Sequence, residues 1–206
     1  MDPADASHIK TTMHDAAIAQ FSEIEWAAAL INDPQWTPTQ TASRRVKSTR
    51  EDSFIAETLD TERTIRSCLT LKPTKEDEGD LAYKEIVTLM DLGDGLNGHP
   101  KILHGGFAAT MLDEVCGILI GLTQEIKVRR LRERGMLNAN TSLTCFTAYL
   151  NTSYKKPIPA PGPVLCRARF ERIDGRKQYI RATIEDGAGT VYTVGDAMFV
   201  EVKAKL

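Results

Sequence analysis

The spacing of hydrophobic residues divides the chain into a helical N-terminal part and a longer part rich in strands. Between residues 13 and 31, apolar side chains recur at helical intervals, and Asn32-Asp33-Pro34 ends the pattern. Residues 34–50 are polar and contain Pro38, which predicts a linker across the surface. A short helical or irregular piece is expected over residues 53–59.

Beyond residue 60 the pattern predicts strands separated by turns. Six stretches are rich in residues that suit a pleated sheet, and turn-forming residues separate all of them except the second and third. The first two are expected to form a hairpin. The predicted strands are residues 64–71, 81–92, 142–154, 164–173, 178–185 and 191–203.

One strong helix interrupts this series of strands, at about residues 106–122. It is apolar over nearly its whole circumference, so we expect other elements to wrap around it. The charged residues 124–135 are expected to continue as an exposed helix or loop. Residues 93–100 precede the helix as a glycine-rich loop that breaks the sheet.

The order of elements predicts an α+β fold in which a curved antiparallel sheet of about six strands wraps around one long central helix. Residues 1–60 are expected to form a helical N-terminal extension and linker that lies against a core domain of residues 61–206. A doubly wound fold needs helices between successive strands, and the C-terminal half offers only turns.

Composition excludes several classes of protein. The 206 residues are 42% hydrophobic and 26% charged, which argues against wholesale disorder, and the formal net charge of −2 predicts no nucleic-acid or membrane partner. The longest nearly apolar stretch, residues 115–122, is too short to span a bilayer. Four widely spaced cysteines and an acidic N-terminus predict reduced thiols and a cytoplasmic location.

Two motifs that could indicate a bound dinucleotide or metal lack the sequence context that such sites require. Residues 93–98 spell G-x-G-x-x-G, but His99 and Pro100 stand between these glycines and the helix, so we interpret the segment as a loop. His99 and His104 have no third ligand nearby, and we predict neither a metal nor a cofactor.

The most informative segment is residues 103–114. His104, Gly105 and Gly106 precede a buried helix, where bare N–H groups and the helix dipole suit a carbonyl oxygen that acquires negative charge. Asp113 places a carboxylate on an otherwise apolar helix. The alternative is that Asp113 caps or pairs locally and that the glycines only allow close packing.

At this point the sequence resembles a family. The pattern HGGxxATxLDE from His104 to Glu114 is similar to the hotdog-fold thioesterase superfamily, of the PaaI-like and mammalian acyl-CoA thioesterase kind. Residues 147–159 resemble the T-A-x-L-x-x-x-Y-x-x-P-x-P strand of that family, and residues 175–177 occupy its usual later turn. The resemblance extends over about residues 64–203.

The resemblance implies hydrolysis of thioesters, mostly acyl-CoA, at sites built across a dimer. It implies that the N–H of Gly105 holds the thioester carbonyl, with Gly106 beside it, and that His104 positions the loop or the thioester. Asp113 would act as general base or nucleophile, and Thr147 would orient the water or the carboxylate.

One departure concerns an Asn that many relatives have six residues before the His. Gly98 stands there in this chain, and Asn97 would take the role only if the loop bulges.

Helix geometry independently favours a shared site. Eight residues separate Gly105 from Asp113, about 12 Å along a helix, which is too far for both to serve one carbonyl carbon. If two helices run antiparallel across a two-fold axis, Gly105 of one subunit meets Asp113 of the other. We therefore expect a homodimer or a dimer of dimers.

Two further sets of charged residues have competing interpretations. Arg129, Arg130, Lys155 and Lys156 would receive the phosphates of CoA, or the arginines simply belong to a solvated charged helix. Glu114 is a rival to Asp113, but one step along a helix turns about 100°, so both cannot face one site. The family pattern selects Asp113.

The sequence thus predicts a thioester hydrolase that acts on acyl-CoA or on a carrier-bound acyl thioester. Two alternatives stay open: a binding or pathway-accessory protein without efficient turnover, and a lyase or hydratase on the same fold.

Overall fold

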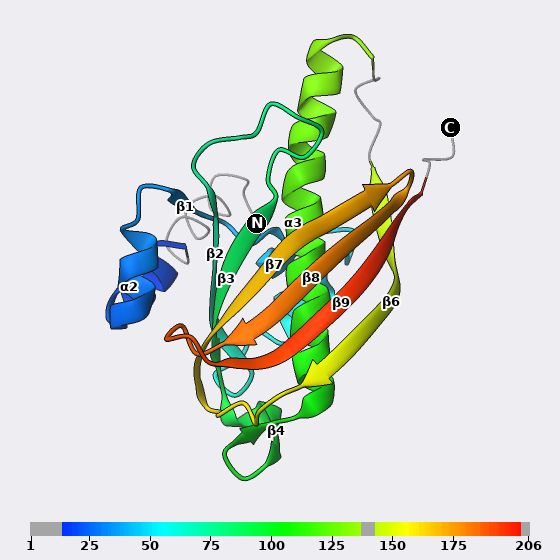
Figure 1. The fold of residues 1–206 in the computed structure, drawn as a ribbon. Helices are drawn as coiled ribbons and strands as arrows, with labels where there is room; N and C mark the ends of the chain where they lie inside the picture. Colours follow the sequence, from blue (N-terminus) through cyan, green and yellow to red (C-terminus); the bar gives the residue numbers. More distant parts are fainter. Residues whose placement is uncertain (1–13, 137–142, 203–206) are drawn as a thin grey trace.

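A single long helix, α3 (Gly105–Glu133), runs across the concave face of a curved antiparallel sheet (Figure 1). The structure is a computed structural model that describes residues 14–136 and 143–202. Predicted positions 13, 142 and 203, which bounded three elements, lie outside the described residues.

The sheet has seven strands in the order β1-β2-β3-β7-β8-β9-β6, and every neighbouring pair is antiparallel. This confirms the hotdog architecture and the hairpin of the first two predicted strands. The strands expected from the sequence are β2 (Ile65–Pro73), β3 (Glu85–Leu92), β6 (Thr144–Tyr154), β7 (Gly162–Asp174), β8 (Lys177–Glu185) and β9 (Val191–Val202).

The seventh strand corrects the prediction of a linker over residues 34–50. Trp36–Thr39 forms β1, which pairs with β2 at the edge of the sheet. Pro38 is tolerated there because an edge strand leaves one row of backbone groups unpaired. A tertiary partner, rather than local propensity, makes this segment a strand.

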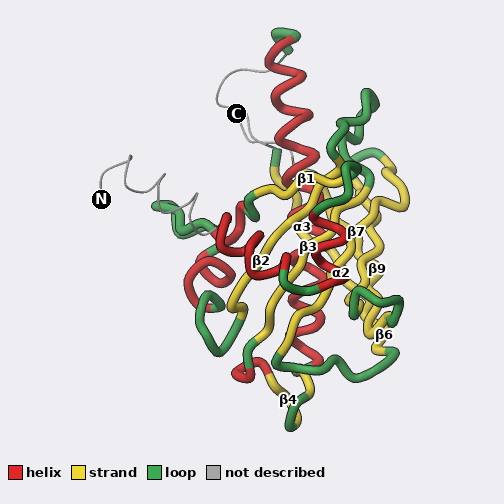
Figure 2. Tube along the Cα trace, turned by 90° about the vertical axis from the view of Figure 1, so that its left-hand side faces the viewer, coloured by secondary structure: helices red, strands yellow, loops and turns green. Residues whose placement is uncertain are grey.

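The predicted N-terminal helix is divided in two. Residues 14–22 are helical, a turn follows at Glu23 and Ile24, and α2 (Glu25–Ile31) continues the segment. In Figure 2 these helices lie in front of the sheet, where Phe21 and Ala27 are buried against β2, β3 and β7. The extension therefore covers the convex face of the sheet.

After β1 the chain crosses to the other side of the sheet. A 3₁₀ turn (Ala42–Arg44) and the π-helix Phe54–Thr58 follow, in agreement with a short helical piece over residues 53–59. The guanidinium of Arg44 donates to the carbonyls of Ile55, Leu59 and Ile65 at 3.0–3.2 Å and pairs with Asp60. This arginine fixes the path of the segment towards β2.

The glycine-rich loop before α3 contains more structure than predicted. A 3₁₀ turn (Asp94–Leu96) leads into β4 (Asn97–His99), which pairs with β5 (Ile102–Leu103). This short ribbon delivers the chain to the start of α3.

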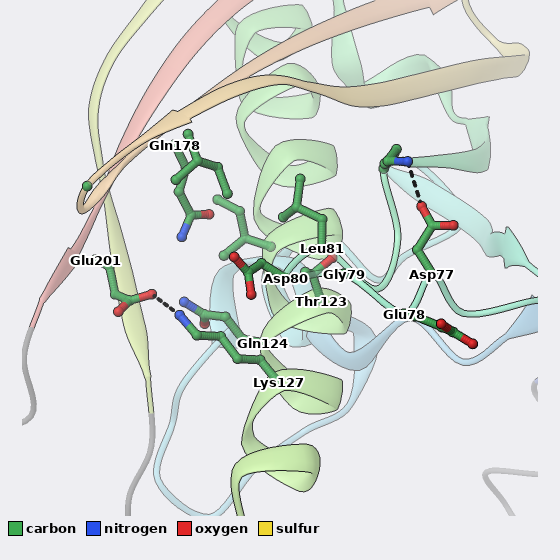
Figure 3. A pocket seen from close by; sticks show the side chains of 14 residues that line it. Asp77, Glu78, Gly79, Asp80, Leu81, Thr123, Gln124, Lys127, Gln178 and Glu201 are labelled. Atoms are coloured by element: carbon green, nitrogen blue, oxygen red, sulfur yellow. Dashed lines mark hydrogen bonds and ion pairs between the residues drawn. The ribbon is translucent and has the colours of Figure 1, made fainter.

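The second half of α3 continues as one helix through the charged residues 124–133. Beside it, a cavity of about 790 Å³ opens towards the β2–β3 loop and the β7–β8 turn (Figure 3). By length and mean hydropathy α3 would also suffice to cross a bilayer, a possibility that the short stretch 115–122 did not indicate. In this fold its apolar residues belong to the core.

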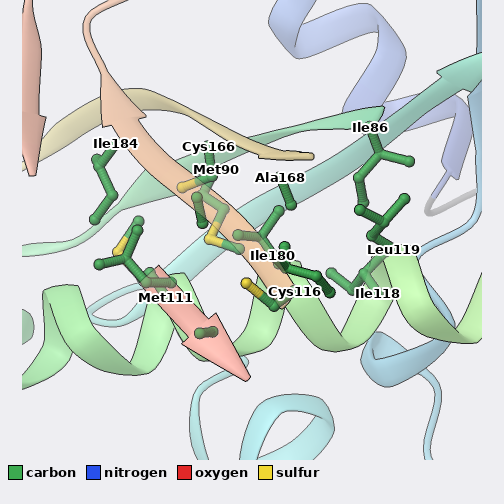
Figure 4. Packing of buried hydrophobic residues seen from close by; sticks show 14 of the residues in the cluster. Ile86, Met90, Met111, Cys116, Ile118, Leu119, Cys166, Ala168, Ile180 and Ile184 are labelled. Atoms are coloured by element: carbon green, nitrogen blue, oxygen red, sulfur yellow. The ribbon is translucent and has the colours of Figure 1, made fainter. Parts of the chain in front are cut away.

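The core lies between α3 and the concave face of the sheet (Figure 4). Met111, Cys116 and Leu119 of α3 are buried against strand residues such as Met90 and Ile180. Ile55 and Leu59 of the extension join the same cluster. The sheet and the returning N-terminal segment thus cover most of the helix, as its apolar circumference predicted, while Gly117 and Gly121 remain exposed.

Candidate active site

The first turn of α3 carries the His-Gly-Gly sequence in a capped conformation. His104 is the N-cap residue, and its Nδ1 accepts a hydrogen bond from the N–H of Gly106 at 3.0 Å. A Cβ at Gly106 would lie only 3.0 Å from the imidazole Cε1, so glycine allows this close approach. The sequence prediction that these residues meet at a helix N-terminus is confirmed.

The N–H of Gly105 is the one amide of this turn that has no acceptor among the described residues. The N–H groups of Phe107 and Ala108 both donate to the carbonyl of His104, at 3.0 and 3.1 Å. Within the described residues, no acceptor faces the N–H of Gly105. Because the first amides of a helix carry partial positive charge, this N–H is a ready donor for an oxyanion.

Gly98 has a steric reason to be glycine. A Cβ at this position would lie 2.9 Å from the Cα of His104, so an Asn side chain would not fit without backbone movement. The pairing of β4 with β5 is irregular between Asn97 and His99, which is the kind of bulge that a role for Asn97 required. The buried Oδ1 of Asn97 has no hydrogen-bond partner among the described residues.

Asp113 lies half-buried on α3 and faces β6. The hydroxyl of Thr147 donates to its Oδ1 at 2.8 Å, which is one of the two contacts expected of Thr147. A shift in register after Thr147 changes the alternation of β6, so that Leu150 packs against the core as well. The structure therefore brings Asp113 and Thr147 together within one protomer.

Tyr154 joins the other end of β6 to the start of α3. Its hydroxyl donates to the carbonyl of Gly105 at 2.9 Å. Tyr154 lies within the strand motif of residues 147–159, but the motif alone predicted no role for it. Its position in that motif was the sequence signal that could have identified it as a site residue.

Asp113 and Glu114 point in different directions, as the helix rotation predicted. Burial raises the pKa of Glu114, an effect that nearby Ser43 and Arg44 of the extension partly oppose. Its Oε1 is buried and has no hydrogen-bond partner in the part of the chain that the structure describes. Asp113 is thus the carboxylate that lies beside Thr147.

The predicted phosphate-binding residues separate into two groups. Arg129 and Arg130 bind Glu76 at 2.7–3.2 Å, and Arg130 also donates to the carbonyls of Asp77 and Gly79. They lie 16 and 17 residues beyond Asp113, about 25 Å along the helix, and anchor the β2–β3 loop. Within one protomer, the structure does not bring these arginines to the His-Gly-Gly turn.

Lys155 and Lys156 lie at the opposite end of the fold, directly after Tyr154. Their backbone N–H groups donate to the carbonyl of Tyr192 at 2.7 and 3.0 Å, and both residues are exposed. They are therefore the predicted cations that lie near the start of α3.

Other reactive groups contribute little to this site. Burial raises the pKa of Cys68 and of Cys145 to about 11, and it also raises the pKa of Cys116 and Cys166, so these thiols stay protonated at neutral pH. Over residues 14–136 and 143–202, no group of three or more His, Cys, Asp and Glu residues has the arrangement of a metal site.

Comparison with known proteins identifies similar sequences and folds. A family model described as "Thioesterase superfamily" matches residues 100–193. The acyl-coenzyme A thioesterase THEM4 of Rattus norvegicus is 31% identical over 122 residues, which cover 59% of this chain and 45% of that protein. Verlamelin biosynthesis protein B of a Lecanicillium species is 24% identical over 165 residues, or 71% of each chain.

A conserved protein of Pseudomonas aeruginosa has a similar structure, with a TM-score of 0.51 and 12% identity. The match covers 79% of this chain and all of that one. At this identity the likeness shows the fold alone. The chain spans less than half the length of the rat relative that it matches.

Proposed function

The chain carries a hotdog-fold domain of the thioesterase superfamily, and on this premise we propose that it hydrolyses acyl-CoA or carrier-bound acyl thioesters. The hydrogen bond from Thr147 to Asp113 is the observation on which the proposal chiefly rests. It holds a half-exposed carboxylate in place and leaves Oδ2 of Asp113 as an acceptor for water. The acyl-CoA thioesterases among the similar sequences support the same substrate class.

In the proposed reaction, the N–H of Gly105 donates to the thioester carbonyl oxygen and stabilises the charge that develops there. Asp113 of the partner subunit takes a proton from water as the water oxygen attacks the carbonyl carbon. Collapse of the tetrahedral intermediate breaks the C–S bond. The thiolate leaves and takes the proton that Asp113 received from the water, and the acyl group departs as a carboxylic acid that ionises in solution.

The need for a partner subunit follows from the geometry of α3. About 12 Å of helix separate Gly105 from Asp113 in one protomer, so a single chain cannot apply both to one carbonyl. We therefore propose a homodimer or a dimer of dimers. β6 has no further strand beside it among the described residues, and Phe146 and Tyr149 on it are 62% and 41% exposed, which supports a protein interface on this side of the sheet.

The cations near the start of α3 support CoA as the leaving group. Lys155 and Lys156 follow Tyr154, whose hydroxyl binds Gly105, so their ammonium groups are available for phosphates near the proposed carbonyl site. A carrier-bound thioester would offer a single phosphate to the same residues.

Release of free thiol from a panel of acyl-CoA thioesters tests the proposal. We expect turnover with at least one chain length and loss of that turnover in Asp113→Asn. If wild-type protein binds acyl-CoA in calorimetry but releases no thiol from any thioester, the chain is a binding protein and the proposal is wrong.

A further inference from the structure

The cavity beside the second half of α3 belongs to no step of the proposed reaction. Leu81, Ile120 and Ile173 form its apolar wall, and Thr123, Gln124 and Gln178 add polar groups (Figure 3). None of the residues proposed for hydrolysis lines it. Its volume of about 790 Å³ falls in the range of small-molecule sites.

Among the described residues that line this cavity, acidic side chains outnumber basic ones. Its two lysines are already paired, Lys127 with Glu201 at 3.2 Å and Lys84 with Asp77 at 2.8 Å. Glu78 and Asp80 also line it, and neither forms an ion pair with any described residue. An anionic group would therefore be repelled, whereas a group that donates hydrogen bonds would find acceptors.

Two glutamines reinforce this acceptor character. The side-chain NH₂ groups of Gln124 and Gln178 both donate to the sulfur of Cys145, at 3.0 and 3.5 Å. This arrangement orients both amides and leaves their carbonyl oxygens as acceptors for another donor. The cavity thus combines an apolar wall with a polar end that carries negative charge and hydrogen-bond acceptors.

The cavity lies on the same side of α3 as Asp113. At 100° per residue, Ile120 and Gln124 are each rotated only about 20° from Asp113 around the helix axis. Gln124 lies 11 residues further along, about 16 Å. With about 1.2 Å per bond, as in an extended polypeptide, a chain of about 13 bonds spans this distance.

Gly117 lies between these positions and leaves the helix surface bare. A Cβ at Gly117 would have no heavy atom within 4 Å, so no packing contact within the protomer requires glycine there. Glycine inside a helix is destabilising relative to alanine, so the bare surface has a stability cost that packing does not explain. A passing substrate chain would use this surface.

These observations point to the class of substrate. The inference rests on the proposed thioesterase function. We propose that the enzyme selects acyl groups of about ten to fourteen carbons whose far end carries a hydrogen-bond donor, such as a hydroxyl or an ammonium group. The acyl chain passes Gly117, and its donor reaches the acceptors around Gln124 and Asp80. A terminal carboxylate is excluded by the same charges.

The test compares four thioesters of equal length: dodecanoyl-CoA and its 12-hydroxy, 12-amino and 12-carboxy derivatives. We expect KM for the hydroxy and amino compounds to be about tenfold lower than for the dodecanoyl compound, since each forms a hydrogen bond to a charged or amide acceptor. The carboxy compound should have the highest KM. kcat should vary little, because the contact lies far from the reacting carbonyl.

Two variants locate the effect. Gln124→Leu should reduce the preference for the hydroxy compound to about twofold or less, and Asp80→Ala, in an exposed loop, should remove most of the preference for the amino compound. Glu125→Leu is the matched control: it introduces the same side chain one residue further along α3, outside the cavity. It should retain the full tenfold preference.

Calorimetric binding of the same four compounds separates this inference from the proposed function. If no compound is hydrolysed but the hydroxy compound binds about tenfold more tightly than the dodecanoyl compound, hydrolysis is refuted and the donor site is supported. If all four compounds bind and react alike, or if the preference survives in both Gln124→Leu and Asp80→Ala, the inference is wrong.

Discussion

Two neighbouring carboxylates on opposite sides of α3 have different environments. Asp113 faces β6, is half-buried and accepts a hydrogen bond from Thr147. Glu114 faces the N-terminal extension, where burial raises its pKa and leaves Oε1 without a partner among the described residues. A rotation of about 100° therefore separates a carboxylate that is available to water from one that is withdrawn from it.

The difference comes from what covers each side of the helix. On the Glu114 side, the segment from Thr41 to Leu59 packs onto α3, and Arg44 ties it to three backbone carbonyls. On the Asp113 side, the edge strand β6 is the described element that contacts Asp113, and most of its side chains are exposed. The extension therefore packs on the Glu114 side of the helix and leaves the Asp113 side uncovered.

Neutralising each carboxylate in turn tests the difference between the two sides of α3. Asp113→Asn should lower kcat by a factor of about 100 to 10,000, the range for loss of a general base, with the fold intact. Glu114→Gln should change kcat by less than about threefold, because its side chain does not face the site. Steady-state kinetics with circular dichroism as the folding control measures both. A severe loss in Glu114→Gln beside a mild one in Asp113→Asn would reverse the assignment.

The amide of Gly105 can be removed without removing the helix. Gly105→Pro deletes the N–H at the first helical position, where proline is favoured, and His104 already has the extended backbone that precedes proline. We expect kcat to fall about 100-fold or more. Gly105→Ala keeps the N–H and places a Cβ 3.5 Å from the ring of Tyr154, an ordinary contact, so it should retain most activity. Equal losses in both variants would show that shape, not the donor, matters here.

Removal of the Thr147 hydroxyl should have a smaller effect. Thr147→Val keeps the volume and the strand propensity but deletes the donor to Asp113. We expect kcat to fall about tenfold with little change in KM, because orientation of the carboxylate matters chiefly in the transition state. Wild-type kinetics in a folded Thr147→Val dimer would mean that the position serves only the sheet.

The raised pKa of Glu114 predicts a pH-dependent stability. In the unfolded chain Glu114 loses its proton near the ordinary value of 4.5, whereas the folded protein holds it to higher pH because of burial. The unfolded state therefore loses its proton first, and the wild type should lose stability as the pH rises from 4.5 to the folded pKa. Arg44 opposes this shift, and Asp52 and Asp113 add to it.

Thermal unfolding between pH 4 and 8 measures this effect. The melting temperature of Glu114→Gln, relative to that of the wild type, should increase as the pH rises, since Gln carries no proton to lose. A constant difference across this range would show that Glu114 titrates normally.

Most of the strands and α3 could be predicted because their signals are local. The apolar circumference of α3 and the alternation of β8 and β9 are properties of short windows of sequence. The motifs around Asp113 and Thr147 located two residues that are 34 positions apart and hydrogen-bonded in the structure. The hydroxyl of Thr147 was expected to bind either Asp113 or water, and the structure shows the contact with Asp113.

The features that could not be predicted depend on distant partners. Trp36–Thr39 is a strand only because the edge of β2 is available, and its proline argued against it. Arg129 and Arg130 were predicted as phosphate ligands, but the β2–β3 loop places Glu76 within hydrogen-bonding distance of both. The division of the first helix at Glu23 and Ile24 could not be predicted either. Phe21 and Ala27, on either side of the division, are buried against the same sheet, so the hydrophobic pattern continues across it.

Mixed dimers test whether Gly105 of one subunit and Asp113 of the other act together on one thioester. Gly105→Pro and Asp113→Asn should each be nearly inactive alone. In a mixed dimer, the Asp113→Asn subunit supplies an intact Gly105 and the Gly105→Pro subunit supplies an intact Asp113, so one of the two sites is complete. Random mixing of equal amounts by co-expression, with thiol release as the assay, should restore about a quarter of wild-type activity. Activity that stays at the level of the two single variants would place both residues in one subunit and contradict the shared site.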